Sequence, residues 1–586
     1  MAVQFFSSFF TSYFAIAITI LCAGVLYYRP CHTLTSLPWV GGATSPWARC
    51  LSNWKGMIKG RQYMEEAHHK YGKRGLSCVM PGPFGEEVML PASLIPWIIA
   101  QPDSILNASV AHAEQVSAEY TMLHEAVARV PLHEDIIRRE LKVQLSNITP
   151  AVVDEVSAAM KDLWDPSSTA TKHRTTYFTV DPSSAFRTVI ARASNRILVG
   201  LPLCRDPDFY NTAASYVSDI AAVGYSLRLL PSCLRPFVAR IATLINKYHF
   251  RRCSHHLAPL IAERLATWNT ADEKARARMP NDYLTWSIRD AYKGTYLTER
   301  SPHMLALRLL TVNFAVIHTT TMTATSLLMD LACSPPAERY ISRIRAEILS
   351  VLADDAPSAT STTTDQTADP TQVWTRARLA KLTLLDSAIR ESMRVSGFQG
   401  KVLTRKVVAR DGLTLPPSET QPAVHLPHNT VVNVPGYAIH HDAAHFPAPH
   451  DFKADRWVDT GKAATTADAQ FIPWGLGRHA CPGRWLAVDL LKVLIAQLLV
   501  RYDVASIDPA MGIRADGGPG RDGEGLKRVW MADIGVPNSG SRVRLRRRDG
   551  GTADDEFERY SLTSLPLQPP QCRTSLPGIS GGLKVT

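Results

Sequence analysis

The sequence predicts a mainly α-helical protein with a small β portion, preceded by one N-terminal transmembrane helix. Apolar residues recur every three or four positions over long segments, which is typical of packed helices. Two short β-like runs, 76–79 and 87–90, lie on either side of a Pro-Gly-Pro sequence, and this pattern favours a small sheet. The segments with helical spacing are 133–163, 183–200, 208–228, 235–268, 303–333, 340–353, 376–396 and 484–502.

The transmembrane helix is predicted from the segment Phe5 to Tyr28, which carries no charged side chain. At about 1.5 Å per residue, a helix of this length crosses a bilayer core of roughly 30 Å. A cleaved signal peptide is the alternative, but no basic region precedes the segment and its apolar stretch is longer than a usual signal core. The first basic residue, Arg29, follows the span, so the positive-inside rule predicts that the rest of the chain is cytosolic.

The composition indicates a globular protein with a large core, because 45% of the residues are hydrophobic and 20% are charged. With 586 residues, the chain could form several domains or one unusually large one. Its ten cysteines include no CxxC pair, which predicts reduced thiols on the cytosolic side. The net charge of +11 is spread along the chain without a basic stripe. This argues against nucleic-acid binding and favours an anionic membrane surface or an acidic redox partner.

Four regions are expected along the chain. Residues 1–28 form the membrane anchor, and residues 29–46 form a proline-rich hinge that ends the membrane helix. Residues 47–548 form the folded body, in which the Ser-, Thr-, Asp- and Pro-rich stretch 352–374 is expected to be a flexible loop. Residues 549–586 hold Gly, Ser and Pro without periodicity and are expected to be a disordered tail.

The most informative segment is a glycine-rich loop around one cysteine, Trp-Gly-Leu-Gly-Arg-His-Ala-Cys-Pro-Gly, which runs from Trp474 to Gly483. A thiolate that binds a metal needs compensating dipoles, and a turn with glycines can aim backbone N–H groups at the sulfur. The helix predicted after the loop adds the positive end of its dipole, which favours an ionised sulfur. Cys481 is therefore the candidate metal ligand, with a merely buried cysteine as the alternative.

This loop resembles the haem-binding loop of the cytochrome P450 family, whose pattern is Phe-x-x-Gly-x-Arg-x-Cys-x-Gly. Three residues fall on the pattern: Gly477, Cys481 and Gly483. Trp474 stands where the family usually has Phe, and His479 where it usually has Arg. The resemblance implies that Cys481 ligates the iron of haem b and that Trp474 covers the sulfur. It also implies that His479 or the neighbouring Arg478 contacts a haem propionate.

Two further stretches resemble the motif with which this family braces the haem loop. Glu391 and Arg394 lie three residues apart and so share one face of the predicted helix 376–396. The segment 452–457 resembles the family's Phe-x-Pro-Glu-Arg-Phe and places Arg456 at its arginine, although the two residues before it differ. The resemblance implies a structural Glu391–Arg394–Arg456 triad with bidentate ion pairing. Taken alone, the spacing of Glu391 and Arg394 is more typical of a solvated surface pair.

The predicted helix 303–333 carries a cluster of hydroxyl side chains in an apolar stretch, which is costly for a helix interior. It resembles the family's oxygen-binding helix, with Ala315 and Thr319 on the pattern and His318 at the acidic position. The resemblance implies that Thr319 holds dioxygen and a water by hydrogen bonds, and that His318 relays protons. A helix-capping or back-bonded core threonine is the alternative for Thr319.

Two more arginines are candidate propionate contacts. Similarity to fungal members of the family suggests Arg138, but the usual Trp-x-x-x-Arg is missing, so a surface arginine is an equal alternative. Arg405 follows the predicted bracing helix and is expected to reach the cofactor from the other side.

The resemblance as a whole implies a catalytic domain over residues 47–548 and a haem-thiolate monooxygenase that inserts oxygen from O₂ into a C–H bond. The motifs look most like those of fungal ent-kaurene oxidase-like enzymes, which implies an apolar substrate such as a terpenoid. No flavin or NADPH domain is visible, so electrons are expected from NADPH through a separate cytochrome P450 reductase, or from cytochrome b5. The expected location is the endoplasmic reticulum membrane, with a single span and a cytosolic catalytic domain.

Two other functions stay open. One is a haem-thiolate isomerase or dehydratase that uses the iron as a Lewis acid, although the threonine-rich helix argues against it. The other is a non-catalytic, membrane-bound haem- or sterol-binding protein.

Overall fold

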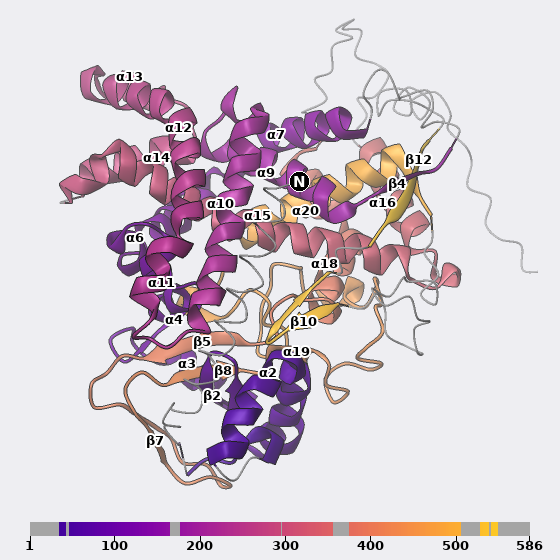
Figure 1. The fold of residues 1–586 in the computed structure, drawn as a ribbon. Coiled ribbons are helices and arrows are strands. Elements are labelled where there is room, and N and C mark those ends of the chain that lie inside the picture. Colours follow the sequence, from indigo (N-terminus) through magenta and orange to yellow (C-terminus); the bar gives the residue numbers. More distant parts are fainter. Residues whose placement is uncertain are drawn as a thin grey trace, which may run out of the picture.

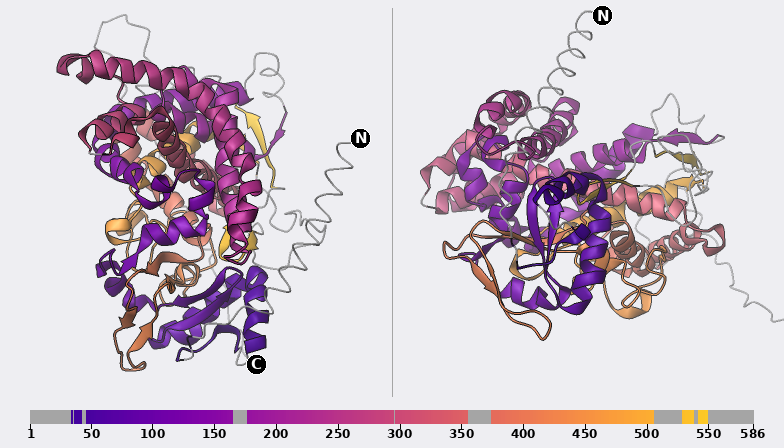
Figure 2. Two further views of the ribbon diagram at one scale, coloured as in Figure 1. Left: turned by 60° about the vertical axis from the view of Figure 1, so that its left-hand side comes forward. Right: turned by 60° about the horizontal axis from the view of Figure 1, so that its bottom comes forward.

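The structure is a computed structural model that describes residues 34, 36–42, 46–164, 176–294, 296–354, 374–505, 528–537 and 541–548. The predicted anchor 1–28 and tail 549–586 lie outside the described residues, as do half of the hinge 29–46 and most of the loop 352–374. The described residues have the predicted fold class, mainly α with a small β portion. Long helices fill one end of the molecule, and a sheet with helix α2 forms the other end (Figure 1 and Figure 2).

The elements have the following bounds. The helices are α2 (Pro46–Glu66), α3 (Ile95–Ala100), α4 (Ala108–Gln115), α5 (Ala118–Thr121), α6 (Glu125–Arg129), α7 (Leu132–Trp164), α9 (Pro182–Leu198), α10 (Pro207–Arg228), α11 (Arg235–Ala242), α12 (Leu244–Thr270), α13 (Glu273–Ala277), α14 (Tyr283–Lys293), α15 (Pro302–Ala332), α16 (Tyr340–Ala353), α17 (Arg376–Lys381), α18 (Thr383–Val395), α19 (Gly436–His440) and α20 (Arg484–Arg501). The strands are β1 (Cys78–Gly82), β2 (Gly85–Met89), β3 (Leu106–Asn107), β4 (Phe178–Val180), β5 (Val402–Val407), β6 (Leu413–Leu415), β7 (Val424–Leu426), β8 (Val431–Val434), β9 (Tyr502–Val504), β10 (Val529–Met531), β11 (Ile534–Val536) and β12 (Val543–Arg547).

Two of the predicted helices are each split in the structure. The predicted segment 235–268 forms α11 and α12, with a break at Thr243, and the segment 376–396 forms α17 and α18, with a break at Leu382. At both breaks the backbone leaves helical geometry for one residue, while the apolar spacing continues on either side. Hydrophobic periodicity alone therefore could not locate these breaks.

Helix α15 is the central helix of the body. Ser301 caps its first turn by accepting a hydrogen bond from the backbone N–H of Met304 at 3.2 Å, and Pro302 occupies the first helical position. The helix packs against α7, α9, α10, α18 and α20. It is also the one helix among the described residues that is long and apolar enough to cross a membrane. Because 72% of its most apolar stretch is buried inside the protein, it is a core helix here.

A buried ion-pair network connects α9 to α7. Glu155 is fully buried and accepts hydrogen bonds from the Nε atoms of Arg192, at 2.8 Å, and of Arg205, at 2.7 Å. A buried carboxylate is stable only when it is paired in this way. The network therefore holds the helices that pack beside α15 in a fixed arrangement.

The largest sheet has the strand order β1-β2-β8-β5-β3. The pair β2 and β8 is parallel and the other neighbours are antiparallel. The predicted run 87–90 lies in β2, but the Pro-Gly of the predicted turn belongs to β1, and the turn falls at Pro83 and Phe84 instead. Strand β5 carries Arg405 opposite Val432 of β8, so the sheet places this arginine at the edge of the helical body.

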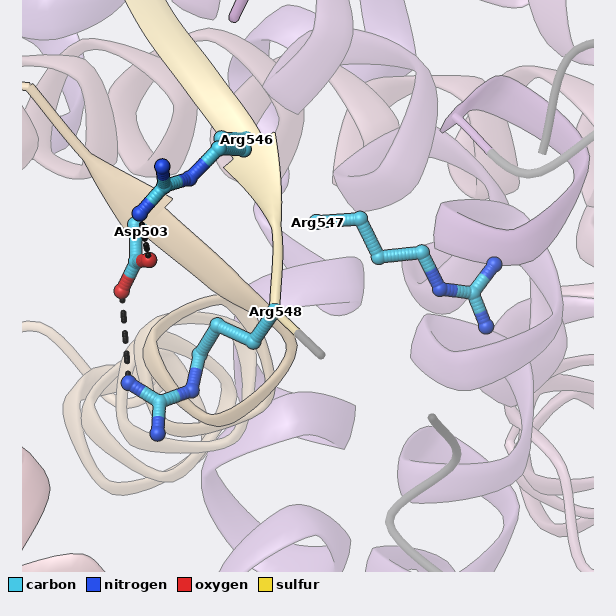
Figure 3. Close-up of a pocket in the computed structure, with 4 residues that line it drawn as sticks. All are labelled: Asp503, Arg546, Arg547 and Arg548. Carbon is cyan, nitrogen blue, oxygen red and sulfur yellow. Dashed lines mark hydrogen bonds and ion pairs between the residues drawn. The ribbon is translucent and has the colours of Figure 1, made fainter. Parts of the chain in front are cut away.

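A second, three-stranded sheet with the order β4-β12-β9 holds the C-terminal strand. Asp503 accepts hydrogen bonds from Arg546 at 3.0 Å and from Arg548 at 3.2 Å, whereas Arg547 points away from it (Figure 3). These four residues line a small polar pocket that includes no residue of α15 or of the loop around Cys481.

Candidate active site

Cys481 lies between a short 3₁₀ turn, Gly477–His479, and the first residue of α20. The N–H of Cys481 donates to the carbonyl of Trp474 at 2.8 Å, and the N–H of Ala480 donates to the carbonyl of Gly477 at 3.1 Å. Gly475 and Gly477 have φ angles of 66° and 70°, in the left-handed region that glycine adopts without strain. The glycines therefore let the loop curl back around the cysteine.

The N-terminus of α20 lowers the pKa of the Cys481 thiol, as the sequence predicts, but burial raises that pKa by more. Burial raises the pKa of the Cys481 thiol above its ordinary value, and the charge of Glu134 adds to this. The N–H groups of Gly483 and Arg484, together with the Arg484 charge, lower the pKa. Because the net shift is upward, these groups alone do not ionise the thiol. A metal cation bound to the sulfur would favour the thiolate.

The other residues of the loop have defined partners. Trp474 donates its indole N–H to the carbonyl of Ala464 at 2.7 Å. Asp103, just after α3, accepts hydrogen bonds from Arg478 at 3.0 Å and from the Nε2 atom of His479 at 2.7 Å. The Arg478 side chain is 43% exposed, whereas that of His479 is only 17% exposed. Of the two predicted propionate contacts, His479 is thus the one that lies in the protein interior.

Arg405 lies close to His479 and to a histidine that sequence reasoning missed. Loss of hydration and the positive charges of Arg405 and His479 together lower the pKa of His112 in α4 to about 4. Burial also lowers the pKa of Arg405 to about 10. The Arg405 side chain donates to the carbonyl of Thr404 at 2.9 Å, and among the described residues no carboxylate lies within ion-pair distance of it. His112, Arg405 and His479 therefore lie near one another, with Arg405 buried and His479 bound to the Asp103 carboxylate.

Arg138 is not part of this group of side chains. It lies on α7, with 41% of its side chain exposed, and forms an ion pair with Asp135 at 3.0 Å. The structure therefore matches the alternative interpretation of this residue as a surface arginine. Its role as a propionate contact stays a prediction.

The structure brings the three residues of the bracing triad together. Glu391 accepts hydrogen bonds from Nε and Nη2 of Arg394, at 3.0 and 2.8 Å, and from Nε of Arg456 at 2.7 Å. The side chains of Glu391 and Arg394 are fully buried. The indole N–H of Trp457 also donates to Glu391, at 3.0 Å. The solvated surface pair, the alternative for Glu391 and Arg394, does not occur.

The triad reaches the cysteine loop through His440. Arg394 donates from Nη1 to the carbonyl of His440 at 2.7 Å. The ring nitrogen Nε2 of His440 accepts the N–H of Ile472 at 2.9 Å, two residues before the loop begins at Trp474. Burial lowers the pKa of His440 to about 3, so the ring stays neutral and can accept this bond. The predicted bracing therefore has a continuous hydrogen-bonded path.

Helix α15 has one accessible strip in its otherwise buried middle. Ala315 is exposed and Thr319, one turn later, is half-buried. Thr319 donates its hydroxyl proton to the carbonyl of Ala315 at 2.7 Å, which is the back-bonded geometry of the alternative interpretation. Its oxygen keeps lone pairs that can accept a hydrogen bond from a water or a ligand. The strip is therefore a surface that a bound group could cover.

His318 points toward a neighbouring helix. Its Nε2 atom lies 3.1 Å from the hydroxyl of Ser218 on α10. Burial lowers the pKa of His318, and the positive charge of Arg187 on α9 lowers it further. The ring is therefore neutral at physiological pH. Sequence reasoning found His318 but had no signal for Ser218.

Comparison with known proteins decides what the site is. A family model described as "Cytochrome P450" matches residues 102–513, which is more than half of the chain. The chain belongs to the cytochrome P450 family. The cytochrome P450 monooxygenase htyF of Aspergillus rugulosus is 30% identical over 493 residues, covering 80% of this chain and 68% of that protein. The cytochrome P450 monooxygenase gloP of Glarea lozoyensis is 30% identical over 511 residues, covering 83% of this chain and 86% of that protein.

Further relatives carry similar names, such as the cytochrome P450 monooxygenase 110 of Postia placenta, which is 28% identical over 79% of this chain and 86% of that protein. This P450 is accordingly a haem monooxygenase, and it needs a redox partner and a hydrophobic substrate. Haem with cysteine-thiolate ligation is the cofactor that the family implies.

The residues present fit a haem. Cys481 offers one half-buried sulfur at the start of α20, and no other cysteine of the described residues lies in such a loop. Arg405 is buried, and among the described residues no carboxylate lies within ion-pair distance of it, so a propionate would give its charge a partner. The accessible strip of α15 gives an apolar surface that a flat ring can cover.

Proposed function

We propose that this P450 inserts one oxygen atom from O₂ into a C–H bond of an apolar small molecule, a terpenoid or a related fungal metabolite. The observation that carries the proposal is the half-buried Cys481 in the glycine-rich loop at the N-terminus of α20, which is braced by the Glu391 triad. When bound, haem supplies the oxygen activation and the C–H oxidation chemistry. The fungal source of the relatives and the apolar strip of α15 support a lipophilic substrate.

The protein's own residues have four tasks in this proposal. Cys481 supplies the axial sulfur, and Trp474 shields it from water. Arg405 and His479, with His112 beside them, hold the propionates, and Arg138 is a further contact. Thr319 accepts a hydrogen bond from an ordered water, and His318 holds and moves a proton at its ring nitrogens.

The partners and the location are also part of the proposal. Electrons come from NADPH through NADPH–cytochrome P450 reductase, with cytochrome b5 as a second donor. Residues 1–28 span the endoplasmic reticulum membrane once and leave the catalytic domain in the cytosol. Protease treatment of sealed microsomes tests this topology, because a cytosolic domain is digested and a lumenal one is protected.

The proposal is tested first by spectroscopy. The reduced protein with carbon monoxide should give the red-shifted band of a thiolate-ligated haem, and Cys481→Ala should abolish that band. Cys233→Ala is the matched control, because Cys233 is an exposed cysteine and should leave the band unchanged. If Cys481→Ala kept the band, the assignment of the ligand would be wrong.

The reaction class is tested with the reductase and a terpenoid library. A monooxygenase consumes NADPH and O₂ together with substrate and forms an oxygenated product. A haem-thiolate isomerase or dehydratase would form product without consuming NADPH, and a haem- or sterol-binding protein would form none. Thr319→Ala should keep the thiolate band but release more hydrogen peroxide per NADPH consumed.

A further inference from the structure

We propose that Ser218 of α10 is a positioning residue that fixes both the orientation and the tautomer of His318. The inference rests on the proposed function, in which His318 moves a proton. It adds a residue from a different helix, one that no sequence motif marks.

The hydrogen bonds of Ser218 determine which of its partners donates. Its hydroxyl oxygen lies 2.9 Å from the carbonyl oxygen of Ala214, one turn earlier in α10, and 3.1 Å from Nε2 of His318. A serine hydroxyl has one proton and two lone pairs. If that proton went to the imidazole, the Ser218 oxygen and the Ala214 carbonyl would face each other as two acceptors. The hydroxyl therefore donates to Ala214 and accepts the proton of His318 Nε2.

This pattern determines the chemistry of the imidazole ring. With its proton on Nε2, a neutral ring carries a lone pair on Nδ1, which becomes its proton acceptor. The ring is neutral because burial and the nearby positive charge of Arg187 lower the pKa of His318. Ser218 thus keeps one nitrogen of the ring as donor and the other as acceptor, which a residue that relays protons needs.

The contact also crosses between two helices that pack against each other. Ile317, next to His318, lies in a small buried cluster with Ala191 of α9 and Ala214 of α10. Two of these three residues are alanines, so the helices approach closely enough for a serine hydroxyl to reach the imidazole ring. The orientation of His318 on α15 therefore depends on the position of α10.

The chain offers a matched control for a merely structural role. Ser215 lies three residues before Ser218 in the same helix and donates its hydroxyl proton to Asn211 at 2.9 Å, the same back-bond that Ser218 makes to Ala214. Ser215 is half-buried, like Ser218, and its hydroxyl forms no hydrogen bond with His318. Ser215→Ala therefore removes the same kind of bond from the same helix without touching the ring.

The experiment uses the full-length haem-loaded protein in lipid nanodiscs with the reductase. The protein consumes NADPH without added substrate, and the ratio of hydrogen peroxide to water formed is measured. This ratio reports proton delivery, because reducing O₂ to water takes more protons than reducing it to hydrogen peroxide. Ser218→Ala should raise this ratio about fivefold, the factor that corresponds to loss of one ordinary hydrogen bond. Ser215→Ala and the conservative variant Ser218→Thr should resemble the unmodified protein. In a His318→Gln background, Ser218→Ala should have no further effect.

A second measurement does not depend on turnover. ¹⁵N NMR of histidine-labelled protein distinguishes protonated from unprotonated ring nitrogens, and the signal of His318 is the one missing from His318→Gln. It should report a proton on Nε2 in the unmodified protein and a shift toward Nδ1 in Ser218→Ala. A proton on Nδ1 in the unmodified protein would overturn the inference.

The outcomes separate this inference from the proposed function. If His318→Gln raised the ratio but Ser218→Ala did not, the role of Ser218 would be refuted and the relay role of His318 would stand. If His318→Gln left the ratio unchanged, the relay role itself would be refuted, and the role of Ser218 with it.

Discussion

Replacing Arg456 by lysine tests the bracing triad while keeping its charge. The Arg456 side chain is 12% exposed and donates from Nε to Glu391 at 2.7 Å and from Nη1 to the carbonyl of Pro447 at 2.8 Å. Lysine ends in a single nitrogen that cannot occupy both positions, so one of the two short bonds is lost. Because Glu391 is fully buried, a hydrogen bond to this charged group contributes about 1.5–3 kcal/mol. We expect the free energy of unfolding to fall by that amount.

Arg343→Lys is the matched control for this prediction. Arg343 forms an ion pair with Asp455 at 2.9 Å, but the two side chains are 44% and 38% exposed. Exposed pairs of this kind contribute about 0–1 kcal/mol. The assay is urea unfolding of the haem-loaded protein, followed by the thiolate carbon monoxide band and by far-ultraviolet circular dichroism. If both variants lost equal stability, or if Arg456→Lys lost none, the bracing role of Arg456 would be refuted.

Two other perturbations have defined outcomes. Gly477→Ala should lower haem retention. Its φ of 70° should reduce the free energy of unfolding by about 1–2 kcal/mol. The loss should be larger still because an added Cβ would lie 3.1 Å from Cβ of Ile99. Gly461→Ala is the control, because its φ is 67° and no atom lies within 4 Å of the added Cβ, so it should show the conformational cost alone. If urea titrations gave the two variants equal losses of stability, the predicted clash with Ile99 would be contradicted. His440 has its pKa lowered to about 3 from 6.5, so the unfolded chain takes up the proton first and stability is lost as the pH falls from 6.5 toward 3. His440→Gln should therefore lose less stability than the unmodified protein between pH 7 and pH 5, and an identical pH profile would count against the neutral acceptor role at Ile472.

The long helices could be predicted well from the sequence. Each of them buries one face against α15 or its neighbours, and this burial requires apolar residues at helical spacing. The segments 340–353 and 208–228 agree with α16 and α10 within one residue. The breaks at Thr243 and Leu382 could not be predicted, because they interrupt the backbone without interrupting the apolar pattern. Short strands such as β5 were missed, since their pairing depends on partners far away in the sequence.

The candidate site divides in the same way. Cys481 and the Glu391–Arg394 pair could be found because their partners lie within a few residues of each other in the sequence. His112 could not, because what distinguishes it is its proximity to Arg405 and His479, which come from other parts of the chain. For Arg138, the position in the sequence gave no indication that the side chain would form an ion pair with Asp135.

The path from Glu391 through His440 to Ile472 lies wholly within the polypeptide. The cysteine loop is thus held in place before haem binds, and little conformational entropy remains to be lost on binding. We therefore expect haem to bind to a preformed site. Its association rate should depend more on access to that site than on folding of the cysteine loop.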